Sequence, residues 1–470
     1  MKTVFIMLSR GFVARNILRT DTFRLIAERS DLRIVLFVPR NIPDYFREEF
    51  VRYPNVVLEE SDDLEFGKFR KKVFEPMLQK MVYSDTARFF MRYGGRSTKA
   101  NKSALSAWLG HLGATLIAKL PFFIPAFRWI EFHAFPDRAY GEFFDKYQPD
   151  LVVATAIKTK RDLAMMKETR RRGVSTVGMA RSWDNLDRIL IAFPPDRLIV
   201  QNEVMSELGV RLHKLRPESI SVTGFPQFDL YQNPETYQPR DEFLRSLGLD
   251  PARRVVMFAS EGVWAPYGPL VADLLAELVA SKAFGEQCSL VVRPHFSDLS
   301  FEREGTPYDH LVGLPNVFVD QHFRSMKFFT DKWDPSFKEM KHLANELKHA
   351  DVLVTYATTL AIESSIVDTP IVNINYRLPG EQVSDGPFFA MFYGSSHYSN
   401  VVRSGATRLV ADREALIAAV RHYLQHPESE RAERRACALR LTYRLDGKSG
   451  ERVAHIILGA LGCQGVIHNL

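Results

Sequence analysis

Residues 351–373 read DVLVTYATTLAIESSIVDTPIVN, and this stretch decides the fold. An apolar, β-branched run breaks at Tyr356, and a helical pattern begins after Thr358 and Thr359. A second apolar strand follows at 371–374. A strand, a tight turn, a helix and another strand in this order predict half of a nucleotide-binding α/β unit.

The turn within this stretch is a candidate phosphate site. Thr358 and Thr359 stand at the start of the helix, where free backbone N–H groups and the positive end of the dipole can hold a diphosphate. Glu363 lies one turn further and can accept hydrogen bonds from ribose hydroxyls, while Tyr356 completes the predicted donor-binding set. An ordinary βαβ unit with capping threonines and a solvated Glu363 would show the same residues, so both interpretations are open here.

Length and composition set the general class. A chain of 470 residues is too long for one compact core, so we expect two domains. Its 46% hydrophobic and 25% charged residues are typical of globular proteins. The cysteines are few and widely spaced (Cys288, Cys437 and Cys463), which argues against a disulfide framework and favours a reducing cytoplasm.

Charge and hydropathy narrow the expected partners. The apolar run at 3–8 is too short for a signal peptide, and no run approaches the roughly 18 apolar residues of a membrane-spanning helix. A net charge of +6 suits phosphorylated substrates or an anionic membrane surface, and it is too small to indicate nucleic acid. We therefore expect a cytoplasmic protein that can contact the inner face of the cytoplasmic membrane.

Two stretches of the chain alternate strands with helices. In the first, strands are predicted at 3–8, 32–38, 151–155, 175–179, 197–201 and 220–223. In the second, strands are predicted at 254–259, 289–293, 317–319, 352–355 and 371–374. Helices between strands imply parallel sheets with right-handed crossovers. The predicted class is α/β, with Rossmann-like domains at 1–235 and 236–440 that face a cleft.

An inserted segment at about 64–145 interrupts the first domain. It is helical in tendency and combines aromatic with basic residues, as in Arg70-Lys71-Lys72 and the apolar string from Trp108 to Phe135. It is either a helical layer that packs on the sheet or a surface that contacts a membrane or a lipid-linked acceptor. The sequence does not separate these alternatives.

The predicted strand ending at Arg293 brings charged chemistry to the cleft. Arg293 can neutralise a phosphate, and His295 can donate a hydrogen bond or act as an acid near neutral pH. The alternative is a polar surface loop. The equivalent turn after 254–259 holds Glu261, which can contact the donor, and Gly262, whose backbone can approach a phosphate closely.

Another polar cluster follows the strand at 175–179. It comprises Ser182, Trp183, Asp184 and Asn185. Trp183 can stack on a sugar or base, and Asp184 and Asn185 supply hydrogen-bond acceptors or a general base. An Asp-Asn turn with a packing tryptophan is the alternative interpretation.

The first strand-to-helix turn contains Arg10, Gly11, Arg15 and Asn16. It lacks a complete GxGxxG, so it fails as a dinucleotide fingerprint, although its arginines suit an anionic acceptor.

The sequence also lacks a Walker loop, a GxSxG nucleophile elbow, an HExxH motif and a cluster of carboxylates for a metal. The available chemistry is electrostatic stabilisation of a diphosphate leaving group together with one acid or base. We predict no metal and no cofactor beyond a nucleotide-activated co-substrate.

Several of these motifs resemble known proteins. The spacing from Thr358-Thr359 through Glu363 to Pro370 is similar to the ribose and diphosphate site of the peptidoglycan N-acetylglucosaminyltransferase, a GT-B enzyme. Other stretches resemble a bacterial surface-polysaccharide family related to the CDP-glycerol glycerophosphotransferases. They are RGFVARNILRT at 10–20, RSWDNL at 181–186, PDRLIVQNE at 195–203, VTGFPQFD at 222–229 and YRLDGKSGERVA at 443–454. The glycerophosphotransferases bind their donor with Lys-Pro-His-Pro, whereas this chain has Arg293-Pro294-His295-Phe296.

The resemblance implies roles for the residues already singled out. Arg293, His295, Thr358, Thr359 and Glu363 would bind the nucleotide donor, with Glu261, Gly262 and Tyr356 beside them. Asp184 would activate an acceptor hydroxyl, with Glu203 as an alternative. The first domain would bind the acceptor through Arg10, Gly11, Arg15, Asn16, Ser182, Trp183 and Asn185. A C-terminal helix within 441–470 would pack back across the cleft.

The resemblance favours a metal-independent GT-B glycosyltransferase of cell-surface polysaccharide biosynthesis. It would move a sugar from a nucleotide-activated donor to a glycan or lipid-linked acceptor. The alternatives are transfer of a phospho-alditol from a CDP donor and a non-catalytic nucleotide-sugar-binding scaffold of an assembly complex. A hydrolysing nucleotide-sugar 2-epimerase shares the fold, but the sequence lacks its group of several catalytic carboxylates and histidines.

Overall fold

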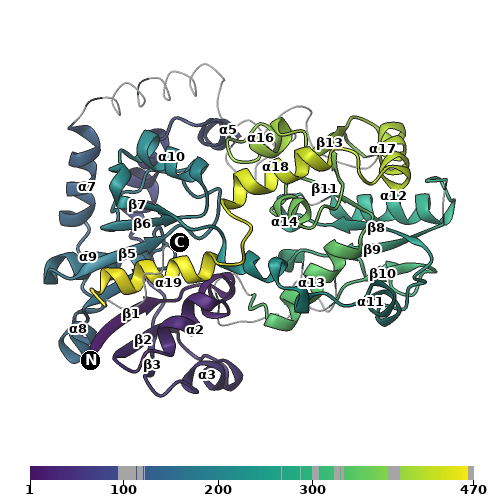
Figure 1. Ribbon diagram of the computed structural model, residues 1–470. Coiled ribbons are helices and arrows are strands. Elements are labelled where there is room, and N and C mark those ends of the chain that lie inside the picture. The colour runs from purple at the N-terminus through teal and green to yellow at the C-terminus, as the bar shows by residue number, and fades with distance from the viewer. Residues whose placement is uncertain are drawn as a thin grey trace.

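The chain folds into two parallel β-sheets flanked by helices (Figure 1). The computed structural model describes residues 1–93, 113, 120, 122–265, 267–285, 287–298, 306–321, 329, 333–378 and 392–463. The two sheets confirm the predicted α/β class with two Rossmann-like domains.

The first sheet has the strand order β3-β2-β1-β4-β5-β6-β7. Its strands are β1 (Lys2–Met7), β2 (Leu32–Pro39), β3 (Val56–Ser61), β4 (Leu151–Ala154), β5 (Ser175–Met179), β6 (Arg197–Val200) and β7 (Ile220–Val222). The order reverses between β1 and β4, and ligands of such sheets bind beyond the carboxyl ends of the strands at that point.

The second sheet has the order β10-β9-β8-β11-β12-β13. Its strands are β8 (Arg254–Ala259), β9 (Cys288–Arg293), β10 (Val317–Val319), β11 (Val352–Thr355), β12 (Ile371–Ile374) and β13 (Thr407–Val410). Here the order reverses between β8 and β11, so the turns carrying Glu261 and Thr358 flank the reversal.

Helices connect the strands of both sheets. In the first domain they include α1 (Gly11–Val13), the π-helical turn η1 (Ala14–Leu18), α2 (Asp21–Ala27), α3 (Asp44–Val51), α9 (Lys160–Arg172) and α10 (Glu203–His213). In the second they include α11 (Arg240–Ser246), α12 (Gly268–Ala280), α13 (Phe337–His349), α14 (Leu360–Ile366), α16 (Ser399–Arg403) and α17 (Arg413–Gln425). Local chemistry fixes their ends: α13 begins with a capping box between Ser336 and Glu339.

The strands are apolar because helices cover both faces of each sheet. Every residue of β4, β9 and β11 is buried, including polar Ser289 and Thr355. Two edge strands were not predicted. β3 and β13 pair on one side only, and their charged residues (Glu59, Glu60 and Arg408) mask the strand pattern. The helical stretch that follows β1 is interrupted at Arg19 and Thr20, between η1 and α2.

The insertion contributes α4 (Glu75–Lys80), α5 (Asp85–Tyr93), α7 (Phe123–His133) and α8 (Gly141–Tyr147). Glu131 of α7 is completely buried and binds Lys167 of α9 at 2.6 Å, as well as Arg70. The described part therefore forms a helical layer on the first sheet. Residues 94–112, 114–119 and 121, including Trp108, lie outside the described residues. No helix in the described ranges is long and apolar enough to span a bilayer.

The chain passes between the domains a second time near its end. Helix α18 (Arg431–Thr442) packs on α14, whereas α19 (Ser449–Ala460) packs on α2 beside the first sheet (Figure 1). The two passages are bonded to each other. The carboxylate of Asp229 caps α19 by accepting from the backbone N–H groups of Ser449 (3.0 Å) and Gly450 (2.7 Å). Arg452 donates to the carbonyl of Thr223 at 2.9 Å.

Candidate active site

Two adjoining cavities lie between the carboxyl ends of the two sheets. The larger cleft cavity has a volume of about 330 Å³ and the smaller one about 220 Å³. Both are lined by Ser182, Trp183, Asp184, Arg188, Trp264, His295, Thr358 and Thr359. The predicted strand-end clusters of both domains therefore meet at one site.

Glu363 lines the larger cleft cavity and contacts Tyr231 of the other domain. Its Oε2 accepts a hydrogen bond from the hydroxyl of Tyr231 at 2.5 Å. Burial raises the pKa of Glu363, and the nearby charge of Arg15 opposes that rise. A buried carboxyl facing a cavity and an aromatic hydroxyl is suited to hold a hydroxyl-bearing ligand.

The turn before α14 is open toward the same cavities. Thr359 occupies the N-cap position without a side-chain cap, and Thr358 Oγ1 accepts from the backbone N–H of Leu360 at 3.3 Å. Both threonines line the two cavities, so a ligand in the cleft would lie beside the start of the helix.

His295 projects from the end of β9 and is held in a neutral form. Burial, together with the charge of Arg293, lowers the pKa of His295 to about 4. Its Nδ1 lies 2.7 Å from Ser297 Oγ. Gly262, at φ +59°, packs against the ring, and a Cβ there would lie 2.6 Å from Nδ1. Only glycine fits this approach without moving the imidazole.

Glu261 adds a second neutral group to this wall. Burial raises the pKa of its carboxyl to about 8, although a hydrogen bond with Thr358 opposes the rise. Glu261 is therefore protonated at neutral pH and can donate a hydrogen bond into the smaller cleft cavity.

Arg293 reaches the cleft with its charge already balanced. Nη1 pairs with Asp320 at 2.5 Å and with Glu346 at 2.6 Å, and both carboxylates are completely buried. Among the described residues, Asp320, Glu346 and His342 lie close enough together to hold a metal ion. The guanidinium of Arg293, however, already pairs with both carboxylates. Arg293 is thus placed to orient the end of β9 more than to supply a free cation.

Tyr356 is placed differently from the other predicted donor residues. Its side chain is completely buried in the core of the second domain, and it lines neither cleft cavity.

The opposite wall, from the first domain, carries ionised groups. Asp184 pairs with Arg188 at 2.8 Å and accepts from the amide of Asn185 at 3.0 Å. Burial alone would raise the pKa of Asp184, but the charge of Arg188 and a hydrogen bond with Ser182 hold it well below its usual range. A carboxylate with a lowered pKa is a weak base, so Asp184 is better suited to position a ligand than to accept a proton.

Nearby, the Nζ of Lys158 donates to the carbonyl of Asn185. Burial lowers the pKa of Lys158 to about 7, and the charges of Arg188 and Arg181 add to that fall.

Residues of the first strand-to-helix turn line the larger cleft cavity or pack against residues that do. Arg15 lines the larger cleft cavity and lies over the ring of Trp333, 5.3 Å from its centroid. Asn16 donates to the carbonyl of Arg181 at 3.1 Å, and Gly11 packs against Trp333 so closely that a Cβ has no room. Arg10 lines a separate basic cavity of about 500 Å³ in the first domain, together with Asn185.

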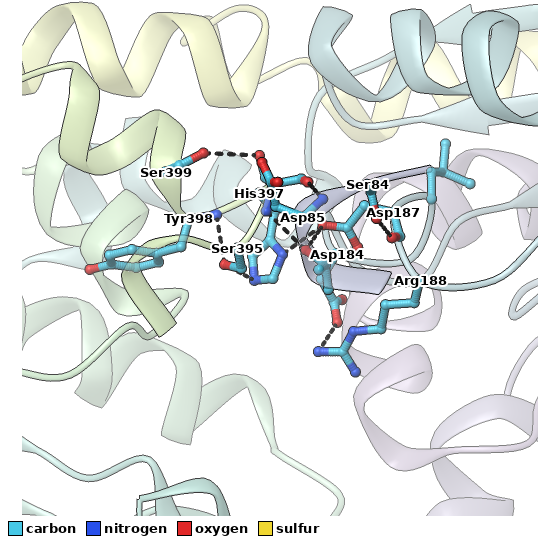
Figure 2. Close-up of polar contacts among 12 residues, drawn as sticks. Ser84, Asp85, Asp184, Asp187, Arg188, Ser395, His397, Tyr398 and Ser399 are labelled. Atoms are coloured by element: carbon cyan, nitrogen blue, oxygen red, sulfur yellow. Dashed lines mark hydrogen bonds and ion pairs between the residues drawn. The ribbon is translucent and has the colours of Figure 1, made fainter. Parts of the chain in front are cut away.

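Sequence analysis missed a histidine–aspartate pair at this site. Asp187, from the turn after Asp184, lies 2.9 Å from Nδ1 of His397, which comes from the second domain (Figure 2). Asp187 directly follows the stretch at 181–186 that the sequence analysis singled out. His397 follows no predicted strand and belongs to no motif, so it gave no signal.

Comparison with known proteins identifies the fold class. No protein-family model matches the sequence, and no curated protein shows significant sequence similarity to it. Among solved structures, S. aureus MnaA with UDP aligns with a TM-score of 0.53 at 10% identity, covering 99% of this chain and 98% of that one. UDP-GlcNAc 2-epimerase from Neisseria meningitidis bound to UDP-GlcNAc aligns at 0.52 and 10% identity, covering 98% and 100%. A glycosyltransferase from Rickettsia africae aligns at 0.50 and 10% identity, covering 98% and 99%.

These likenesses extend over the whole of each chain and show the GT-B arrangement of two Rossmann-like domains. At such identities they concern the fold, and the activity has to be argued from the site.

Proposed function

We propose that this protein is a metal-independent GT-B glycosyltransferase. It would move a sugar from a nucleotide-activated donor to a glycan or lipid-linked acceptor of cell-surface polysaccharide biosynthesis. The observation that carries the proposal is the convergence of Thr358, Thr359, Glu363 and His295 on one wall of a cavity closed by the first domain.

The charges of the cleft suit a nucleoside diphosphate. Arg15, Arg181 and Arg188 face the larger cleft cavity from the first domain, while Glu261 is protonated and His295 is neutral on the other wall. A diphosphate at the start of α14 would accept hydrogen bonds from backbone N–H groups and from His295. Its departure as a leaving group would be stabilised there electrostatically.

The ribose would lie deeper, toward Glu363. That carboxyl faces the cavity and is oriented by the hydroxyl of Tyr231. The acceptor would approach from the first-domain wall, where Trp183 and Asp184 line both cavities and Arg10 lines the adjoining basic cavity. Closure of the domains would exclude water and align the reacting atoms.

Solved structures of the same fold support the donor class. Two of the aligned proteins were solved with UDP or UDP-GlcNAc, and we infer a nucleotide-sugar donor for this chain by analogy. The same site would also accept a CDP-linked phospho-alditol, with attack at phosphorus in place of the anomeric carbon.

Nucleotide binding tests the proposal directly. Thermal shift and calorimetry with UDP, CMP, CDP and GDP should give a stabilising ligand for the full-length protein. Glu363→Ala should weaken that binding at least tenfold, because the ribose loses its acceptor. The control is Glu277→Ala, which removes a surface carboxylate from α12 in the same domain.

The outcomes separate the alternatives. No shift with any nucleotide favours the scaffold, and unchanged binding by Glu363→Ala refutes the ribose assignment. Release of CMP from CDP-glycerol without hydrolysis of nucleotide sugars favours phospho-alditol transfer. Formation of a free 2-epimeric sugar from UDP-GlcNAc would show that the protein is an epimerase and not a transferase.

A further inference from the structure

The pair of Asp187 and His397 joins the two domains at the edge of the smaller cleft cavity. Asp187 belongs to the loop after β5 in the first domain, and His397 precedes α16 in the second domain. The Nδ1 of His397 lies 2.9 Å from Oδ2 of Asp187, and the hydroxyl of Thr86 donates to the same oxygen at 2.7 Å. Figure 2 shows the imidazole between the two loops, with Asp184 and Arg188 beside it.

The contacts of this histidine define its tautomer. Because a carboxylate only accepts hydrogen bonds, Nδ1 has to carry the proton that Asp187 accepts. In the neutral ring Nε2 then holds a lone pair. Among the described residues its hydrogen-bond partner is Ser395, whose Oγ lies 3.5 Å away and already donates to the carbonyl of Phe392 at 2.9 Å. The lone pair is therefore available to a ligand.

The surroundings hold the ring in place. The side chain of Asp187 is completely buried, and the ring of Trp183 meets that of His397 edge to face with centroids 5.1 Å apart. His397, Asp184, His295 and Thr358 line the same cavity. A group held by a buried aspartate and directed into a cavity with two predicted substrate-binding walls has the arrangement of a general base.

We propose that His397, oriented by Asp187, is the catalytic base that accepts the proton of the acceptor hydroxyl. This assignment rests on the proposed transferase function and replaces Asp184 in that role, since the oxygens of Asp184 are engaged by Arg188 and Asn185. In the step, the acceptor oxygen forms a bond to the anomeric carbon while its proton passes to Nε2. The bond from that carbon to the diphosphate oxygen breaks, and the nucleotide leaves with the electron pair. Asp187 is the positioning residue.

The position of the pair has a consequence for control of the reaction. Because its members come from different domains, the base is correctly oriented only when the domains are together. A donor bound to an open form would therefore lack an oriented base to activate a hydroxyl or water.

Turnover and binding test the assignment. With a donor selected by the nucleotide panel, or UDP-GlcNAc as the first probe, His397→Gln should lower nucleotide release about a hundredfold or more and change nucleotide affinity less than threefold. The control is His310→Gln, which removes an exposed histidine paired with Asp273. Activity of His397→Gln within threefold of the parent, or a parallel loss of nucleotide binding, would overturn the proposal.

A second measurement does not need turnover. In protein labelled with ¹⁵N-histidine, the resonance lost in His397→Gln should show an unprotonated Nε2 in the neutral ring. Asp187→Asn should move the proton to Nε2, because an amide can donate to Nδ1. Protonation of Nε2 in the parent would overturn the proposal. If the parent binds no nucleotide, the proposed function is wrong. The tautomer alone then tests whether Asp187 orients His397.

Discussion

The two walls of the cleft differ in the charge state of their buried groups. The first-domain wall keeps its groups ionised and paired, as in Asp184 with Arg188 at 2.8 Å. The second-domain wall keeps its groups neutral: the pKa of Glu261 is raised to about 8 and that of His295 is lowered to about 4. Burial is the largest influence on all three groups, so the difference comes from the neighbours.

Under the proposed function, the difference indicates which wall would receive the diphosphate of the donor. Neutral groups on the second-domain wall present little repulsion to an incoming diphosphate and can donate hydrogen bonds to it. Paired ions on the opposite wall are already satisfied and hold a fixed geometry. The comparison predicts that the two walls respond differently to pH and to substitution.

The largest expected effect is on the pH dependence of stability at Glu261. Its folded pKa of about 8 exceeds the ordinary value of 4.5, so the folded state binds more protons between these limits. Stability contributed by this group is therefore complete below pH 4.5 and is lost as the pH rises to 8. Relative to the parent, Glu261→Gln should become more stable by up to about 1.4 kcal/mol per pH unit within this window.

Urea unfolding of both proteins at several pH values measures this difference. Glu277→Gln, which alters an exposed glutamate paired with Arg413, controls for the loss of a surface carboxylate. A parent–variant difference at Glu261 that stays constant with pH would remove the distinction between the walls.

A smaller effect is expected from breaking the ionised wall. Asp184→Asn removes the carboxylate that pairs with Arg188 and favours the charge of Lys158, so we expect a loss of about 2 kcal/mol of unfolding free energy at pH 7. Asp21→Asn removes an exposed partner of Arg24 and should cost about 0.5 kcal/mol. Equal losses in chemical denaturation would show that the pair in the cleft acts as an ordinary surface pair.

The smallest effect concerns proton uptake. A bound diphosphate should raise the pKa of His295 from about 4, so nucleotide binding near pH 6 should take up part of one proton. Calorimetry in buffers of different ionisation enthalpy measures the uptake, and His295→Gln should abolish it. Undiminished uptake in the variant would assign the proton to another group.

The sequence was sufficient for the buried elements of the fold. The bounds of β5, β8, β10, β11 and β12 coincide with those predicted, because each is a short apolar run bounded by polar or turn residues. The strand β3 was missed since its residues are half-buried and include Glu59 and Glu60. Helix α13 was not predicted, although Ser336 and Glu339 have the residue types and spacing of a capping box.

The candidate site was only partly predictable for a different reason. Strand ends identify which segments meet in a cleft, and this rule found Asp184, His295 and Thr358. It does not give the partners of a side chain: the two carboxylates on Arg293 lie 27 and 53 residues away in sequence. His397 reaches the cleft from a loop whose position depends on tertiary packing, which no local pattern records.

The double passage of the chain between the domains restricts how the two domains can move. The two segments that cross between the domains lie side by side, because Arg452 bonds to Thr223 and Asp229 caps α19. Together they would act as a hinge. Because α19 also packs on α2, both crossing segments leave the first domain at one place, so a motion of one domain against the other has to flex both of them there. Because Asp187 and His397 belong to different domains, the distance between them would change with such a motion.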